Sequence, residues 1–359
     1  MTLTLPSPRE EAWRWSDLSA LPQLAEAQPS GRLPDAPPWI DVPGPRLLFV
    51  DARLAEGSDP GPVQFGEVDA DAGDHPLARL IGHRGWQLRL GRDHATAGPL
   101  QVIHVSTGSA DHLAAEIQLE QDAQASVIET FIGDGWANRL SAVRLAKGAR
   151  LMINRRLLGS SGFVSVTDRA DVGEGASLTL VTLAAGQTDS RIEGRIRISG
   201  DAGFAEAGGA LLARGSQRHD VNFNVAHEAV GGMSRQVWRS VADDQATCSV
   251  AARVDVARGA QKTDGEQSLK GLLLARTATI NSKPELEIFA DDVKCAHGAT
   301  VGALDAQALF YLTSRGVSPE EAKAMLTRAF VADAIDRVGE EAVREAFHAD
   351  ALRWLGVGE

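Results

Sequence analysis

GASLTLV (Gly175–Val181) is one of four segments that share a pattern; the others are GARLMIN (Gly148–Asn154), DAQASVIE (Asp122–Glu129) and DAGFAEAG (Asp201–Gly208). Each has Gly or Asp, then Ala, then a run in which apolar and polar residues alternate. The shared alanines are 26, 27 and 26 residues apart. A steady spacing of this size indicates stacked units that bury their faces on one another. The pattern predicts parallel strands wound into a solenoid, a β-helix.

Alternating runs continue through residues 100–302, for example LQVIHVS (Leu100–Ser106), ATCSVAARVDV (Ala246–Val256) and ELEIFADDVKC (Glu285–Cys295). Alternation with period two is typical of strands. The runs are not separated by segments that could form connecting helices, which argues against a βαβ fold. Aromatic residues make up only 5% of the chain and there are 36 glycines, so small and branched side chains must fill the core. We expect an all-β core over residues 100–302.

Helical signals flank this core. Residues 1–45 contain a short helical pattern (10–27) followed by a segment rich in Pro and Gly (28–45). This segment is predicted to be an extended linker, because Pro removes a backbone donor and restricts its neighbour. Residues 46–99 form a transition into the core. Residues 303–359 are predicted to be helical.

The C-terminal helices have clear start signals. Asp305 can cap a short helix that Gly316 closes. Ser318 and Glu321 form a predicted capping box with Pro319 in the first turn. A last helix follows at 340–355. The predicted apolar stripe of the middle helix contains Ala322, Met325, Leu326, Ala329 and Phe330.

Composition excludes several function classes. The net charge is −12 and no Lys/Arg run is present, which disfavours nucleic acid as a partner. There is no apolar run of membrane-spanning length and no signal-peptide pattern at the N-terminus. Two cysteines cannot build a disulfide framework, so we expect a cytoplasmic protein with reduced thiols and no membrane contact. GxxxxGK[ST], GxSxG and HExxH motifs are absent, which argues against nucleotide binding by a P-loop and against these hydrolase classes.

Cys295 and His297 are the candidate ligands of a metal site. Residues i and i+2 of a strand point to the same face, and thiolate and imidazole groups bind zinc, iron and iron–sulfur centres. Two ligands are too few for a closed site, so either a second chain completes it or the pair is simply part of an inward-facing strand. The other cysteine, Cys248, has no His nearby and fits a buried structural role.

The segment Gly259–Asp336 resembles the SufB/SufD family, scaffold subunits of the SUF iron–sulfur cluster assembly system, and in particular its SufD branch. The residues that carry the resemblance are Gln261–Asp264, Lys283–Ile288, Asp291–Cys295, His297–Gly302, Leu309–Leu312 and Ser314–Gly316. The N-terminal Glu11–Leu18 is similar to a second family motif, with Trp15 and Ser16 in place of the usual Tyr and Thr. Ala296 replaces the usual Ser between Cys and His.

The resemblance implies a right-handed parallel β-helix flanked by helical terminal regions. It implies a non-catalytic scaffold that pairs with SufB through the β-helix and shares with it a site for the nascent Fe–S cluster, where His297 is the first candidate ligand and Cys295 the second. Lys294 is expected to favour the Cys295 thiolate. Reduced flavin is a further ligand reported for complexes of some relatives.

The resemblance also implies that the C-terminal helices dock SufC, an ABC-type ATPase, so that the partner and not this chain binds nucleotide. The residues expected at this contact are Leu309, Phe310, Tyr311, Arg315, Met325 and Phe330. From the residues alone, an amphipathic helix packs more often on its own domain.

Two other functions fit parts of the pattern. A SufB-like homodimeric scaffold would share the fold, but the Cys-x-His spacing and the lack of further cysteines count against it. A β-helix enzyme acting on carbohydrate would be expected to have more aromatic residues, a signal peptide and a pair of acidic residues on one coil.

Overall fold

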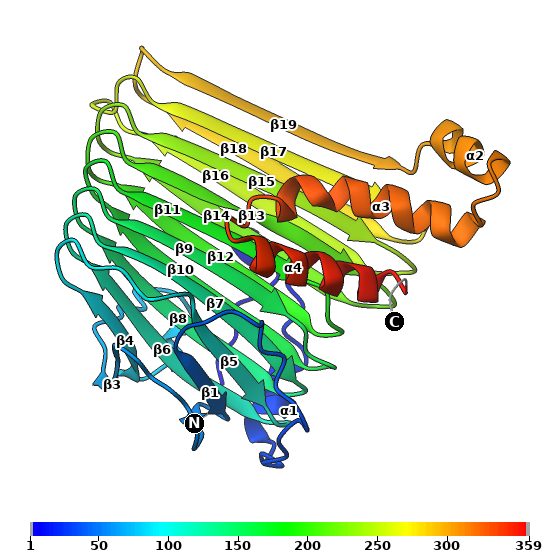
Figure 1. Cartoon of the computed structure of the whole chain (residues 1–359). Coiled ribbons are helices and arrows are strands. Elements are labelled where there is room, and N and C mark those ends of the chain that lie inside the picture. Colours follow the sequence, from blue (N-terminus) through cyan, green and yellow to red (C-terminus); the bar gives the residue numbers. More distant parts are fainter. Residues whose placement is uncertain (1–2, 357–359) are drawn as a thin grey trace.

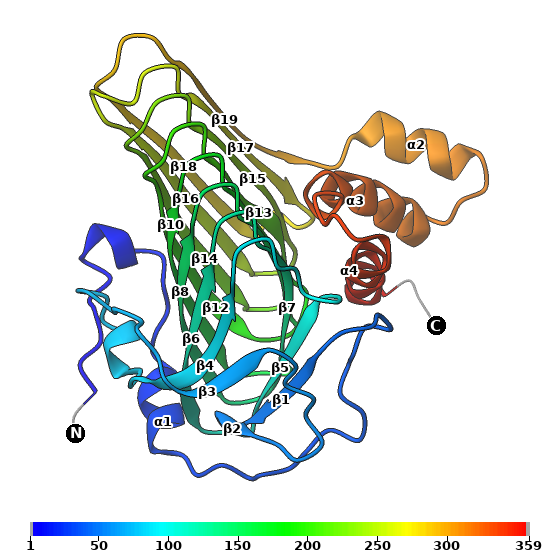
Figure 2. The same cartoon turned by 60° about the vertical axis from the view of Figure 1, so that its left-hand side comes forward.

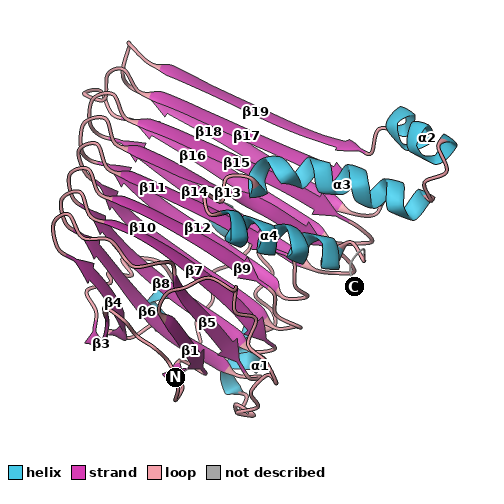
Figure 3. Cartoon of the chain, viewed as in Figure 1, coloured by secondary structure: helices cyan, strands magenta, loops and turns pink. Residues whose placement is uncertain are grey.

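The computed structural model describes residues 3–356, and in them the alternating runs form two parallel sheets that wind around a shared interior (Figure 1). From β4 to β19, odd-numbered strands build one sheet and even-numbered strands build the other, so each coil contributes one strand to each sheet. The result is a β-solenoid of about eight turns. The predicted all-β solenoid with helices at both ends is confirmed (Figure 3).

The ten-stranded sheet contains, in spatial order, β19 (Lys294–Ala303), β17 (Asp264–Leu273), β15 (Met233–Ala242), β13 (Phe204–Ala213), β11 (Ser177–Ala184), β9 (Arg150–Leu157), β7 (Gln124–Gly133), β5 (Leu100–Ser106), β1 (Arg46–Val50) and β2 (Arg53–Leu54). The nine-stranded sheet contains β18 (Thr279–Ile288), β16 (Thr247–Val256), β14 (Arg218–His227), β12 (Asp189–Ile198), β10 (Phe163–Val172), β8 (Trp136–Leu145), β6 (Ala110–Leu119), β4 (Arg84–Leu90) and β3 (Val63–Glu67).

The repeated Gly/Asp–Ala pair is the turn that opens β7, β9 and β11 of the ten-stranded sheet. Asp122, Gly148 and Gly175 have φ of 58°, 68° and 60°, the left-handed region that Gly and Asp tolerate best. The alanine that follows each of them is fully buried. In these three coils the sequence pattern therefore marks one left-handed residue followed by one small buried residue.

The fourth match is shifted by one residue from the sequence alignment. Ala202 itself takes the left-handed position, with φ 54°, and Gly203 follows at the small position, since Phe204 pairs with Ser177. Later coils are also longer than the repeat indicates, because Phe204 pairs with Met233 and Met233 with Asp264, so the coil length rises to 29 and then 31 residues. Longer turns accommodate the extra residues.

The outer face of the ten-stranded sheet is apolar and is covered by helices. Val181 and Leu212 of the sheet pack with Val331 and Phe347 of two C-terminal helices. A buried ion pair between Arg156 and Asp350 adds a polar link, with Nε 2.6 Å from Oδ2. Figures 1 and 2 show these helices lying along one side of the solenoid.

The C-terminal helices are α2 (Ala306–Ser314), α3 (Pro319–Ile335) and α4 (Glu341–Trp354). Their predicted starts are confirmed: Asp305 accepts hydrogen bonds from two backbone N–H groups, and Ser318 and Glu321 form the capping box. The predicted stripe of α3 was partly wrong, because Met325 and Ala329 are exposed. The buried face of α3 consists of Ala322, Ala324, Thr327, Val331, Ala334 and Ile335.

The N-terminal residues run along the nine-stranded sheet, from β8 and β10 to Lys283 of β18, whose Nζ lies 2.6 Å from Oε1 of Glu11. The predicted helical segment 10–27 is split into a 3₁₀ turn η1 (Glu11–Trp13) and a short helix α1 (Leu21–Glu26), and a second 3₁₀ turn η2 lies at Ala78–Leu80. The segment 11–26 lies against the nine-stranded sheet, opposite α3 and α4 (Figure 2). Within residues 3–356, no helix has the length and apolar character to cross a membrane.

Candidate functional site

The two ends of the solenoid differ. At the first end, β2 and β3 pair antiparallel with β1 and β4, and so occupy the edges of both sheets. At the last end, β19 pairs only with β17 and β18 only with β16. Unpaired strand edges present rows of free backbone donors and acceptors. The last coil is therefore an open edge in both sheets.

Exposure of the last coil agrees with its open edge. Nine of the ten residues of β19 are exposed, and none of β18 is fully buried. Strands in the middle of the solenoid have mostly buried residues instead. Exposed large apolar side chains on and beside these last two strands are Ile288, Phe289 and Val301, at 38%, 59% and 44% exposure. This end lacks the cover that the first end has within the described part of the chain.

Cys295 and His297 both lie on β19, at the open end. Their i, i+2 spacing places them on one face of the strand, as the sequence predicts. The thiol of Cys295 packs over the next coil, where a Cβ added to Gly265 would lie 3.5 Å from its Sγ. His297 is exposed, and pairs in register with Gln267. One ligand candidate is thus half-buried and the other faces solvent.

The environment of Cys295 keeps its thiol protonated. Burial raises the pKa of the Cys295 thiol, and the Asp264 carboxylate raises it further, while the backbone N–H of Gly265 offsets part of this shift. Lys294, which the sequence predicted to favour the thiolate, is exposed and is not among the groups that shift this pKa, while burial beside apolar residues disfavours the charged form. A thiol in this state becomes a good ligand only when a metal displaces its proton.

Polar side chains lie directly below His297 in the solenoid interior, and no sequence pattern indicated them. Gln236 and Gln267 pair in register on successive coils, and both are buried. Both side-chain polar atoms of Gln267, and Oε1 of Gln236, have no hydrogen-bond partner among residues 3–356. Unpaired buried amides cost free energy. Register between strands about thirty residues apart creates this column, and only a correct coil length would have revealed it.

The candidate ligands do not form a closed metal site within the chain. Among residues 3–356, no three His, Cys, Asp or Glu side chains are close enough together to hold a metal ion. Cys248, the second cysteine, is fully buried with its Sγ 3.7 Å from the carbonyl of Val241. Burial raises the pKa of its thiol strongly. Its predicted structural role is confirmed.

A second candidate surface is formed by α2 and the exposed face of α3. Helix α2 has no buried residue, and Phe310, Tyr311 and Met325 are 74%, 57% and 51% exposed. The guanidinium of Arg315 lies 5.2 Å from the centre of the Tyr311 ring. Leu309 is half-buried.

Of the six residues expected at this surface, Phe330 differs from the rest. It is half-buried and packs against the core between the helices and the sheet. Its side chain therefore helps to hold α3 on the sheet. The remaining five lie on α2, directly after it, or on the exposed face of α3.

Comparison with known proteins identifies the family. The model of the SUF system FeS cluster assembly SufBD core domain matches residues 102–330, a range that contains most of the solenoid, α2 and most of α3. The chain belongs to the SufB/SufD family. Proteins of this family are scaffolds of iron–sulfur cluster assembly and are generally non-catalytic.

Relatives of known name agree with this assignment. The chain is 25% identical to the iron–sulfur cluster assembly protein SufD of Escherichia coli over 95% of its own length and 87% of the relative. It is 24% identical to SufD of Bacillus subtilis, over 83% and 72%. It is 26% identical to a SufBD family protein of Mycobacterium leprae, over 99% and 92%. Within the family the chain is SufD-like rather than SufB-like.

Proposed function

We propose that the chain is the SufD-type subunit of a SufB–SufC–SufD complex that assembles and transfers Fe–S clusters, without catalytic turnover of its own. The open last coil is the observation that carries this proposal. A solenoid needs a cap at each end to shield its interior, and here one end has none within residues 3–356. A SufB solenoid is the partner of matching shape.

Pairing at this end explains why the ligand set is incomplete. His297 and Cys295 stand on the edge strand, so they would face whatever chain pairs with β19. Residues of SufB would then complete a site for the nascent cluster, which is the cargo of the complex. A neutral imidazole can bind iron without losing a proton, whereas the protonated thiol of Cys295 must lose one. His297 is therefore the stronger candidate ligand.

The second part of the proposal assigns α2 and the exposed face of α3 to the SufC ATPase. A helix with no buried residue gains little from its own domain, and aromatic side chains as exposed as Phe310 and Tyr311 are typical anchors of interfaces. Nucleotide would then be bound by the partner. A cytoplasmic location and binding of reduced flavin to the complex stay predictions of the family resemblance.

Co-purification tests the proposal. The chain is expressed with SufB and tagged SufC from the same genome, and the mass, iron and acid-labile sulfide of the eluted complex are measured for the wild type and for His297→Ala. We expect a three-component complex in both cases and a loss of iron and sulfide in the variant. His94→Ala, which changes an exposed histidine far from β19, is the matched control and should keep both.

Each outcome has a distinct meaning. If His297→Ala keeps its iron, the scaffold function stands and the ligand assignment is wrong. If no complex forms, or if the chain purifies only as a homodimer that carries the cluster, the SufD-type assignment itself is wrong.

A further inference from the structure

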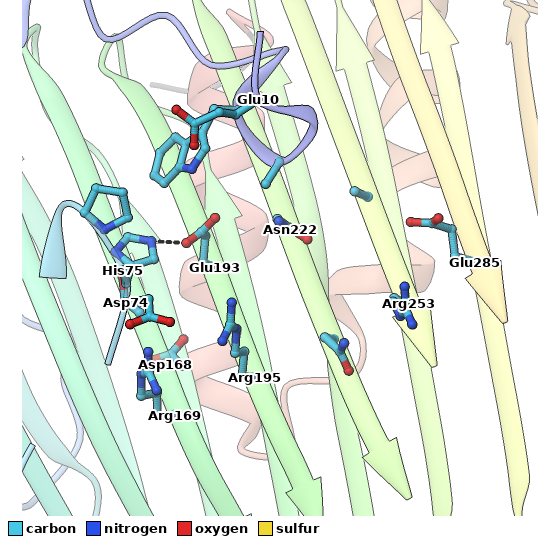
Figure 4. Close-up of a pocket in the computed structure, with 17 residues that line it drawn as sticks. Glu10, Asp74, His75, Asp168, Arg169, Glu193, Arg195, Asn222, Arg253 and Glu285 are labelled. Carbon is cyan, nitrogen blue, oxygen red and sulfur yellow. Dashed lines mark hydrogen bonds and ion pairs between the residues drawn. The ribbon is translucent and has the colours of Figure 1, made fainter. Parts of the chain in front are cut away.

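A hollow on the outer face of the nine-stranded sheet is unrelated to the surfaces described above. It has a volume of about 310 Å³ and lies between the sheet, the N-terminal turn at Glu10–Trp13 and the loop that contains His75. A second hollow of about 550 Å³ continues along the sheet. Arg169 and Arg195 line both of them, and Figure 4 shows their side chains on neighbouring strands.

Most acidic groups around the first hollow already have partners. Glu193 contacts Arg191 and His75; burial raises its pKa, but these two partners outweigh that effect and lower it to about 2. Glu285 lies 3.0 Å from the ammonium of Lys283. Both carboxylates are therefore already paired with cationic or imidazole groups.

Asp168 and Asp74 are also engaged elsewhere. The carboxylate of Asp168 lies 3.0 Å from the guanidinium of Arg155 inside the solenoid. Asp74 pairs with Arg79 at 3.0 Å on the surface. Neither is within ion-pair distance of the two arginines that the hollows share.

Arg169 and Arg195 have no such partner. Neither forms an ion pair within 4.0 Å among the residues that the structure describes, whereas Arg197, two residues further along β12, contacts both Asp171 and Glu228. Arg169 donates to the carbonyl of Ala72 at 2.6 Å, and its Nε is shielded from solvent without a hydrogen-bond partner. The cationic charge of both side chains is therefore uncompensated.

The register puts the two charges directly beside each other. Arg169 of β10 pairs with Arg195 of β12, and adjacent strands are about 4.8 Å apart. Like charges opposite each other on neighbouring strands are destabilising. A bound anion removes this repulsion and supplies the missing acceptors, because guanidinium groups match carboxylate and phosphate oxygens. The hydrogen bond to the carbonyl of Ala72 holds the Arg169 guanidinium in place, and the lack of a side chain at Gly73 leaves room for it, because an added Cβ would lie only 2.7 Å away.

We propose that this cleft binds a small anion with a phosphate or carboxylate group, held between Arg169 and Arg195. The side-chain amide of Asn222 also lines the first hollow (Figure 4) and can donate a further hydrogen bond to an anion there. The volume suits a small phosphorylated or carboxylated metabolite rather than a macromolecule. The site is independent of the cluster ligands on β19.

Calorimetric titration of the full chain with two probes, pyrophosphate and citrate, tests the proposal. We expect one of them to bind with a Kd below about 1 mM, and Arg195→Gln to weaken that binding by about tenfold or more, because a charge-assisted hydrogen bond contributes about 1.5–3 kcal/mol. Arg195 is exposed, so the variant should fold normally, which a thermal unfolding curve checks. Arg197→Gln is the matched control, and its affinity should stay within about twofold of wild type, since Arg197 is already paired.

The probe that binds identifies the source of the anion. Preference for pyrophosphate indicates a phosphorylated ligand, and preference for citrate indicates a carboxylate. The proposal is overturned if neither probe binds below about 1 mM, or if Arg197→Gln weakens binding as much as Arg195→Gln, which would show a diffuse charge effect.

Discussion

The left-handed turn residue is the unit that repeats in this chain. Asp122, Gly148, Gly175 and Gly231 occupy it in four coils, and they are the residue types that adopt positive φ at least cost. Ala202 occupies the same position with φ 54°. Lys262 occupies it in a later coil, with φ 61°. Both residues pay a steric penalty there that glycine avoids, so the turns at Ala202 and Lys262 are strained.

Ala202→Gly should therefore stabilise the protein. Relief of the left-handed strain, about 1–2 kcal/mol, exceeds the entropic cost of glycine on folding, about 0.5–1 kcal/mol, which leaves a net gain of up to about 1.5 kcal/mol. The measurement is the midpoint of urea unfolding. Ala176→Gly is the matched control: Ala176 is fully buried and follows the left-handed Gly175, so the same substitution should lower stability. An unchanged or lower urea midpoint for Ala202→Gly would show that the left-handed conformation of Ala202 does not destabilise the folded protein.

How far the sequence predicts single residues depends on where their neighbours lie. The i, i+2 spacing alone places Cys295 and His297 on one face. The raised pKa of Cys295 could not be predicted, because Gly265 and Asp264, which surround the thiol, are a full coil away. The same holds for Gln267 below His297. Local spacing can be read from the sequence. Contacts between coils can be predicted only when the coil length is known, and that length varies in this chain.

At the scale of elements, α2 and α3 differ in how they pack. Helix α3 packs a face of small and branched residues on β13 and β15, while α2 contacts mainly α3 and leaves its aromatic residues in solvent. The sequence predicted both helices and their caps, because caps are local. It misplaced part of the α3 stripe, since Ala and Thr of the buried face are weak hydrophobic signals and Met325 of the exposed face is a strong one.

Phe310→Ala separates docking from folding. Phe310 is 74% exposed, so its removal should leave the thermal midpoint unchanged and weaken the association with the SufC ATPase, by about 1 kcal/mol or more if it is an anchor. Pull-down and calorimetry with purified SufC measure this. Phe347→Ala on α4 is the control for an effect on folding. Its side chain is fully buried, and its loss should lower the free energy of unfolding by about 3–5 kcal/mol. If Phe310→Ala binds SufC normally, another face docks the ATPase.

At the scale of the whole molecule, the solenoid has a closed first end and an open last end. A partner chain can therefore pair with strands at the last end only. The closed end needs β2, β3 and the N-terminal segment, which the sequence showed only as a linker and a transition. Antiparallel edge strands of two and five residues are too short to give a periodic signal. The repeat predicted the solenoid itself. The exposure of its last coil could not be predicted from the sequence and is seen only in the structure.

The solenoid interior also sets how the whole molecule responds to acid. Burial lowers the pKa of His104, His219 and His227 to about 4. Their folded-state pKa values lie below the ordinary value of 6.5. As the pH falls from about 6.5 to about 4, the unfolded chain therefore binds protons that the folded chain does not, and stability falls across this window. Each histidine can contribute on the order of 2–3 kcal/mol to this loss.

His219→Gln should reduce this acid sensitivity. In the folded chain the neutral ring lies between the Ser190 hydroxyl, 2.8 Å from Nδ1, and the Leu212 carbonyl, 3.3 Å from Nε2, an arrangement that an uncharged amide can partly replace. The difference in urea midpoint between about pH 7.5 and about pH 5 should shrink in this variant. His94→Gln, at an exposed histidine, should keep the wild-type difference. An equal pH response in all three proteins would mean that groups other than the buried histidines, such as the paired carboxylates, control acid unfolding.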